Sequence, residues 1–135
     1  MPLMEWSDKL SVHIPSVDRQ HKVILGYIND LHDGIERGEI KGILDNTLDG
    51  LFNYTRVHFA YEETLFKRCG YEQEAEHLKV HERMLGKVKE FRDRYKRGEK
   101  ELAPELLDFL KDWLYHHILE DDMAYSEFMI SKGIE

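Results

Sequence analysis

A chain of 135 residues is expected to form one domain over residues 1–135, with a core large enough to need no disulfide staples. Its formal net charge of −8 argues against nucleic acid and anionic membrane surfaces as partners. No apolar run nears the roughly 20 residues that span a bilayer, so we expect no membrane insertion. Cys69 is the single cysteine and the N-terminus lacks a signal-peptide pattern, which together predict a cytoplasmic protein.

Apolar residues recur at spacings of three and four along most of the chain, which is the pattern of amphipathic helices. We predict an N-terminal arm over residues 1–15 that is extended and packs against the bundle, followed by helices over about 17–37, 42–69, 71–97 and 104–131. Ser16 or Asp18 suits the first N-cap, and Gly70 fits the C′ position after the second helix. Short connections between four helices predict an all-α, antiparallel up-down-up-down four-helix bundle.

Histidines and carboxylates recur on the core-facing stripes of these helices. At about 1.5 Å of rise per residue, they all fall within roughly 6 to 21 Å of the same end of an antiparallel bundle. Such groups are costly to bury unless something compensates them, and a metal ion is the usual compensation. A lone histidine on an apolar stripe is more often a filler than a ligand, but agreement in both face and height favours metal binding. The set comprises His21, His58, Glu62, His77, His81, His117 and an aspartate that follows His117.

Two aspartates compete for the last place. Asp121 lies four residues after His117 and would share its face on a regular helix, so geometry alone slightly favours Asp121. Asp122 lies five residues on and needs the helix to widen by one residue, as in a π-bulge. The remaining polar groups fit no such pattern: we interpret Glu63 as part of a solvated face, and His13, His32 and His116 as solvated or as neighbours of ligands.

Five imidazoles and two carboxylates are too many for one zinc ion, which binds four ligands. Two octahedral ions offer about twelve positions; five histidines, two bridging carboxylates and one oxo or hydroxo bridge fill about eleven, which leaves one open. This mixture suits two iron ions that change between Fe²⁺ and Fe³⁺. Oxygen-activating di-iron bundles carry more glutamates and two Glu-x-x-His motifs, whereas here only Glu74-x-x-His77 occurs. We therefore expect reversible binding of a small ligand rather than oxygen insertion.

The chain resembles the hemerythrins, and more specifically the single-domain bacterial hemerythrins, from Trp6 to about Tyr125. The residues that carry the resemblance are Asp18-Arg19-Gln20-His21-Lys22, His58-Phe59-Ala60-Tyr61-Glu62-Glu63, His77-Leu78-Lys79-Val80-His81 and Trp113-Leu114-Tyr115-His116-His117-Ile118 with Asp122.

The resemblance implies a role for each matched residue. It favours Asp122 over Asp121, because the family spaces its bridging aspartate five residues after the histidine. It implies that His77, His81 and His117 bind one iron, that His21 and His58 bind the other, and that Glu62 and Asp122 bridge them. Dioxygen would bind the iron with two histidines, in a water-free pocket of Ile24, Phe59, Trp113, Leu114 and Ile118.

The function implied is reversible dioxygen binding at a non-haem di-iron site, for oxygen carriage, storage or delivery, and not catalysis. An oxygen-consuming enzyme or a reductase is the candidate protein partner. Two alternatives use the same site: a di-iron oxidase or nitric oxide/peroxide reductase, and an oxygen sensor, although a sensor normally needs an output domain besides.

Overall fold

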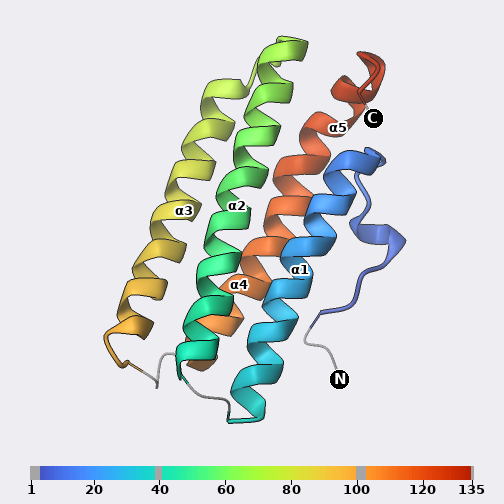
Figure 1. Cartoon of the computed structure of the whole chain (residues 1–135). Coiled ribbons are helices and arrows are strands. Elements are labelled where there is room, and N and C mark those ends of the chain that lie inside the picture. The colour runs from blue at the N-terminus through green and yellow to red at the C-terminus, as the bar shows by residue number, and fades with distance from the viewer. Residues whose placement is uncertain (1–3, 39–40, 100–102, 135) are drawn as a thin grey trace.

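The computed structural model describes residues 4–38, 41–99 and 103–134, with the backbone alone for residues 41–44, 103 and 121. Within these residues every regular element is helical. The elements are η1 (Asp8–Leu10), α1 (Pro15–Glu36), α2 (Lys41–Cys69), α3 (Glu74–Lys96), α4 (Ala103–His116), η3 (His117–Asp122) and α5 (Met123–Ser131). Because α4, η3 and α5 follow one another without a break, we call them together the fourth rod, and α1, α2 and α3 the first three rods; the rods lie side by side in Figure 1.

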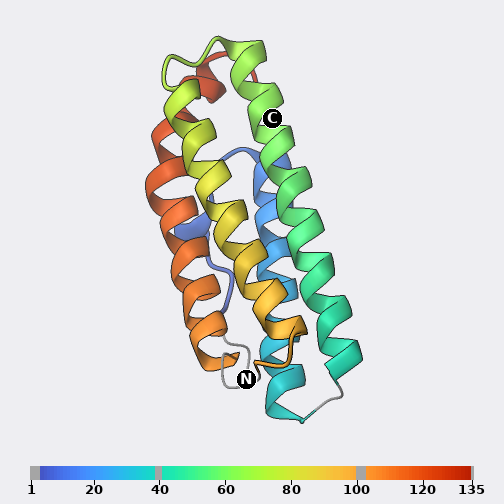
Figure 2. The same cartoon turned by 90° about the vertical axis from the view of Figure 1, so that its left-hand side faces the viewer.

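The rods alternate in direction, and each packs mainly on its two neighbours. The principal contacts join α1 with α2, α2 with α3, α3 with α4 and α4 with α1, which closes a ring around one core (Figure 2). The predicted all-α up-down-up-down bundle is therefore confirmed. Each helix turns its apolar stripe inward, and residues such as Ile28 on α1, Leu51 on α2 and Leu110 on α4 are fully buried.

The N-terminal segment runs beside α1, as Figure 1 shows, and inserts apolar side chains that include Leu10 and Ile14. Asn29 fixes its start by accepting a hydrogen bond from the Met4 amide and donating one to the Met4 carbonyl, both at 2.8 Å. The first helix begins at Pro15, two residues earlier than a Ser16 N-cap would allow, because proline suits the first helical position.

Asp18 does not cap its own helix but holds the segment that precedes it. Its carboxylate accepts hydrogen bonds from the Ser11 hydroxyl at 2.6 Å and the Val12 amide at 2.9 Å. The expectation that Ser16 or Asp18 is the N-cap was therefore wrong, since Ile14 occupies that position without a side-chain hydrogen bond.

The connection from α2 to α3 lies at the end of the bundle nearest the histidine cluster. Gly70 adopts a φ of +69°, which a side chain would disfavour, and this lets the Tyr71 amide donate to the Phe66 carbonyl at 3.0 Å. Gly70 thus has the predicted C′ role. The third helix begins at Glu74 rather than just after Gly70, because residues 71–73 complete the turn.

Candidate metal centre

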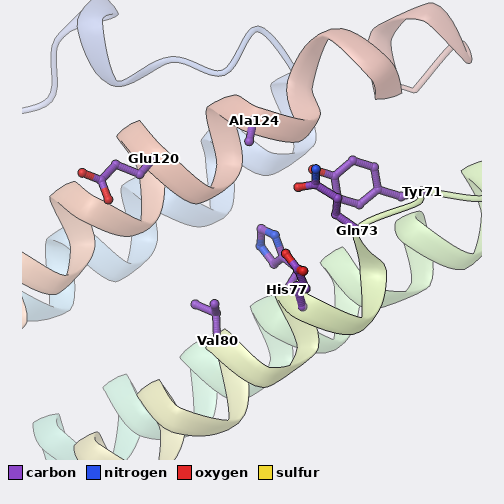
Figure 3. Close-up of a pocket in the computed structure, with 7 residues that line it drawn as sticks. Tyr71, Gln73, His77, Val80, Glu120 and Ala124 are labelled. Carbon is purple, nitrogen blue, oxygen red and sulfur yellow. The ribbon is translucent and has the colours of Figure 1, made fainter.

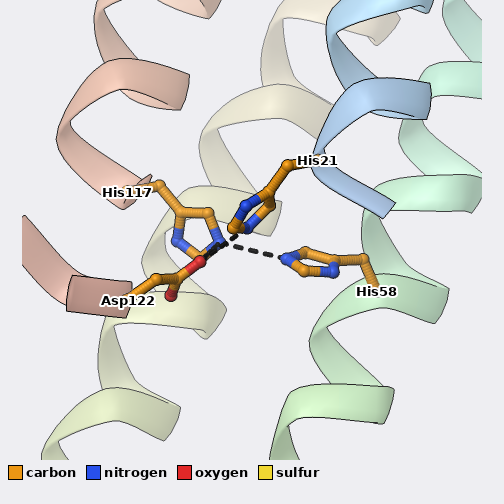
Figure 4. A group of neighbouring side chains, drawn as sticks. All are labelled: His21, His58, His117 and Asp122. Carbon is orange, nitrogen blue, oxygen red and sulfur yellow. Dashed lines mark hydrogen bonds and ion pairs between the residues drawn. The ribbon is translucent and has the colours of Figure 1, made fainter. Parts of the chain in front are cut away.

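Each of the four rods contributes to one buried polar cluster in the upper half of the bundle in Figure 1. α1 supplies His21, α2 and α3 supply two residues each, and the fourth rod supplies His117 and Asp122 from the two ends of η3. Figure 4 shows side chains from α1, α2 and the fourth rod pointing toward one another. Six of the seven cluster residues are at most 1% exposed and the seventh, His77, is 7% exposed; they are His21, His58, Glu62, His77, His81, His117 and Asp122.

The donor atoms of the cluster lie close enough to share ions. Asp122 Oδ2 is 2.6 Å from His21 Nε2 and 3.0 Å from His117 Nε2. Glu62 Oε1 is 2.9 Å from His58 Nε2, 3.2 Å from His117 Nε2 and 3.5 Å from His81 Nε2. The remaining histidine, His77, has its Nε2 3.6 Å from Asp122 Oδ1.

The cluster divides into overlapping groups whose donor atoms lie within 4.8 Å of one another. His21, His58, His117 and Asp122 form one group. Glu62 forms a second with His81 and His117, and a third with His77 and Asp122. Both carboxylates therefore belong to two groups, as bridging ligands would. His117 also belongs to two, so its pairing with His77 and His81 on one iron stays a prediction.

A widened helical turn brings Asp122 into the cluster. The segment η3 is π-helical, and the Met123 amide donates to the Ile118 carbonyl five residues earlier. A turn of this kind inserts one extra residue and returns position 122 to the face of His117. Asp122 is completely buried, whereas the side chain of Asp121 lies outside the described part of the chain. His116, which precedes His117 in the sequence, points away from the cluster: its side chain is about 70% exposed and its Nδ1 lies 3.3 Å from Glu120 Oε1.

Hydrogen bonds behind the cluster orient three of its members. The His58 Nδ1–H donates to the Gln20 amide oxygen at 2.7 Å, and the His81 Nδ1–H donates to the Glu63 carboxylate at 3.0 Å. Such partners direct the opposite ring nitrogen toward a metal ion and raise its basicity. Glu63, which we expected only on a solvated face, is 32% exposed and also accepts this hydrogen bond from His81.

Tyr125 orients the third member. Its hydroxyl donates to Glu62 Oε2 at 2.5 Å, while Glu62 Oε1 faces the histidines. Burial raises the pKa of the Tyr125 hydroxyl well above its ordinary value, and the Asp122 and Glu62 charges raise it further, so the donor proton is retained. The hydrogen bond depends on how α2 and α5 face each other, which spacing does not encode.

The electrostatics of the cluster keep its carboxylates charged. Burial opposes the charge on Glu62, but His58 and His117 outweigh burial and hold the pKa of the carboxyl well below its ordinary range. Burial and Glu62 both raise the pKa of Asp122, yet His117 and His21 lower it by more. Burial disfavours the charged form of His117 too, but both carboxylates raise its pKa well above the ordinary value. Burial lowers the pKa of His58, which keeps its ring neutral.

The donor set fits metal ions. Six buried atoms that face the centre have no hydrogen-bond partner among the described residues: the Nε2 atoms of His21, His77 and His81, Glu62 Oε1 and both Asp122 oxygens. Two ligand atoms that sit at right angles about 2.1 Å from one ion are about 3.0 Å apart. The separations of 2.6 Å between His21 and Asp122 and of 3.6 Å between His77 and Asp122 bracket this value. Cations at the centre would satisfy atoms that the protein itself leaves unsatisfied.

Apolar side chains surround the cluster on the side of α4. The Phe59 ring stacks on His81 with centroids 3.9 Å apart, and the Trp113 ring stacks on His117 at 5.7 Å. All five residues predicted to line an oxygen pocket are buried: Ile24, Phe59, Trp113, Leu114 and Ile118. Their part in oxygen binding stays a prediction.

The chain thus folds as a four-helix bundle whose core contains a buried cluster of histidines and carboxylates that could hold metal ions. The chain matches the family model of the hemerythrin HHE cation binding domain over residues 12–128. It is 38% identical to a bacteriohemerythrin of Pseudomonas aeruginosa (strain UCBPP-PA14) over 125 residues, which is 93% of this chain and 80% of the relative. A bacteriohemerythrin of Methylococcus capsulatus (strain Bath) is 32% identical over 126 residues, which is 93% of this chain and 95% of the relative.

Solved structures agree. The crystal structure of wild-type hemerythrin superimposes with a TM-score of 0.87 at 30% identity, and covers 94% of this chain and 98% of its own. A leucine-to-alanine mutant of hemerythrin gives a TM-score of 0.88, also at 30% identity, with coverage of 96% and 98%. The chain belongs to the hemerythrin family, as the sequence motifs predicted. Within the described residues, no helix has the length and apolar character to cross a membrane.

Proposed function

We propose that this protein binds two iron ions through the seven cluster residues and binds dioxygen reversibly at that centre. The observation that carries the proposal is the overlap of the donor groups, in which Glu62 and Asp122 are each shared. Two carboxylates shared between groups of histidines match the ligand set of a di-iron site, not that of a single four-coordinate ion. Membership of the hemerythrin family supports iron as the metal and dioxygen as the ligand.

The protein residues have separate tasks in this proposal. His21, His58, His77, His81 and His117 would hold the ions through ring nitrogens, and the two carboxylates would balance their positive charge. Iron bound there would supply reversible electron transfer to dioxygen. Tyr125 keeps its proton and fixes the orientation of Glu62 through the hydrogen bond to Oε2.

Exclusion of water is the task of the apolar shell. Leu114 and Ile118 are completely buried and Trp113 is 4% exposed, so the α4 side of the centre is dry. A dry site hinders the protonation and loss of a reduced oxygen species, which is the route to irreversible oxidation. This shell favours carriage, storage or delivery of oxygen over turnover. We place the protein in the cytoplasm, with an oxygen-consuming enzyme as the partner that receives the oxygen.

Stoichiometry tests the proposal. Protein purified with iron is assayed for metal, reduced anaerobically and titrated with dioxygen while the visible spectrum is followed. We expect two iron ions and one bound dioxygen per chain. One iron per chain, or two irons with no oxygen-dependent spectrum, would contradict it.

A further inference from the structure

A surface pocket of about 200 Å³ lies beside the cluster and has one cluster residue, His77, in its wall. It lies between the first turns of α3 and the neighbouring η3 and α5, with Glu76, His77 and Val80 on one side and Glu120 and Ala124 on the other. Figure 3 shows the His77 ring pointing from α3 toward the rod that carries Glu120 and Ala124.

His77 belongs both to this pocket and to the metal-binding groups. It is the most exposed of the seven cluster residues, at 7%, and its Nε2 has no hydrogen-bond partner among the described residues. The same atom lies 3.6 Å from Asp122 Oδ1, inside the group of Glu62, His77 and Asp122. A single imidazole therefore separates the pocket from the buried donors.

The size and charge of the pocket suit a hydrated divalent cation. A hollow of about 200 Å³ has room for several waters and so admits a small ion with its hydration shell. Two carboxylates, Glu76 and Glu120, lie in its wall, and the wall contains no lysine or arginine. Carboxylates that line a concave surface concentrate cations at its mouth.

We propose that this pocket is the port through which Fe²⁺ enters and leaves the metal centre. Glu76 and Glu120 attract the hydrated ion, and His77 is the first protein ligand to replace one of its waters before the ion passes to Glu62 and Asp122. This inference rests on the proposed iron centre. It assigns to Glu76 and Glu120 a role in transit and none in the finished site.

Release of iron from the loaded, reduced protein tests the port. Fe²⁺-loaded protein is mixed anaerobically with an excess of a coloured ferrous chelator, and the rate of colour formation is measured. The double substitution Glu76→Gln with Glu120→Gln should slow release about tenfold, because the pocket then has no negative charge to attract Fe²⁺ as it leaves the centre. The matched control is Glu82→Gln with Glu127→Gln, which changes the net charge equally at exposed positions on α3 and α5 outside the pocket wall.

A steric variant makes the test independent of charge. Ala124→Phe should fill the pocket and slow release as well, whereas Ala60→Phe, at an exposed position on α2, should not. All of these variants should still bind two iron ions per chain. Release that is equally fast in the control and in either pocket variant overturns the port but leaves the iron centre intact. Absence of iron from the unsubstituted protein overturns the proposed function instead.

Discussion

At the scale of single residues, Asp122 makes contacts with more histidines from different helices than its place in a regular helix would allow. Its two oxygens face His21, His77 and His117, which come from three different rods. Asp122 reaches this point because the helix widens by one residue in η3. Substitution of Asp122 is therefore a sharp test of the proposed ligand set.

Substitution of Asp122 by asparagine should lower the iron content from two per chain to one or less. The amide oxygen is a weaker donor than a carboxylate, and it leaves the charge of two cations poorly balanced. Iron per chain is measured after purification under identical metal supply. Asp121→Asn is the matched control and should retain two iron ions, because Asp122 is the aspartate that faces the histidines. Loss of iron from Asp121→Asn with retention by Asp122→Asn would show that the ligand has been misassigned.

Tyr125 allows a test of the residues that orient the ligands. Tyr125→Phe removes the hydroxyl that donates to Glu62 Oε2 and leaves a buried carboxylate oxygen without that partner. We expect iron affinity to fall about tenfold and the free energy of unfolding to fall by about 1–3 kcal/mol. Competition with a chelator measures the first and denaturant unfolding the second. Tyr115→Phe, at a half-buried position on α4, should change neither. Unchanged iron affinity would contradict the claim that the Tyr125 hydrogen bond orients Glu62 for iron binding.

At the scale of elements, the fourth rod contributes both a ligand-bearing π segment and the apolar lining. Leu114 on α4 is completely buried among the core residues, next to Trp113, whose ring stacks on His117. Leu114 lies three residues before His117, a spacing that shares a helix face, so we expect removal of its side chain to open space beside the centre without removing a donor atom.

Leu114→Ala should therefore hasten irreversible oxidation of the oxygenated protein, since water gains access to the centre. The truncation should also cost about 2–5 kcal/mol of unfolding free energy. Leu107→Ala is the control: Leu107 is buried in the same helix seven residues earlier, so it should lose comparable stability with no faster oxidation. The decay of the oxygenated spectrum gives the rate. Equal rates in the two variants would show that the effect follows stability and not shielding.

The elements also show what sequence reasoning could reach. Six of the seven cluster residues followed from spacing, because a helix of 3.6 residues per turn brings residues three or four apart to one face. Asp122 did not follow, because a π turn leaves no mark in the apolar pattern, and only the family motif favoured it. The contacts of Gln20, Glu63 and Tyr125 depend on the rotation of one rod against another. Periodicity along a single helix carries no information on that rotation.

At the scale of the whole molecule, bound metal ions should stabilise the packing of the four rods against one another. Every rod contributes at least one residue to the cluster, so bound metal ions would tie together segments that are otherwise held by apolar packing. Without cations, two anionic carboxylates and five imidazoles stay buried in one core, which is costly.

Removal of iron should accordingly lower the thermal midpoint of unfolding by more than about 10 °C, since a ligand at a thousand times its dissociation constant contributes about 4 kcal/mol. Scanning calorimetry of the loaded and the chelator-stripped protein measures the shift, and re-addition of Fe²⁺ without air should restore it. A midpoint that does not depend on iron would mean that the cluster is stable without metal.

Reversible oxygenation tests the central claim most directly. The iron-loaded protein is reduced, exposed to air and then flushed with inert gas, and its visible spectrum is recorded at each step over several cycles. An oxygen-dependent absorption band that appears and disappears with little loss per cycle is the predicted result, because the histidine-rich, dry centre binds dioxygen without consuming it. A band that forms once and never reverses, or steady consumption of oxygen by a reductant, would contradict the proposed function.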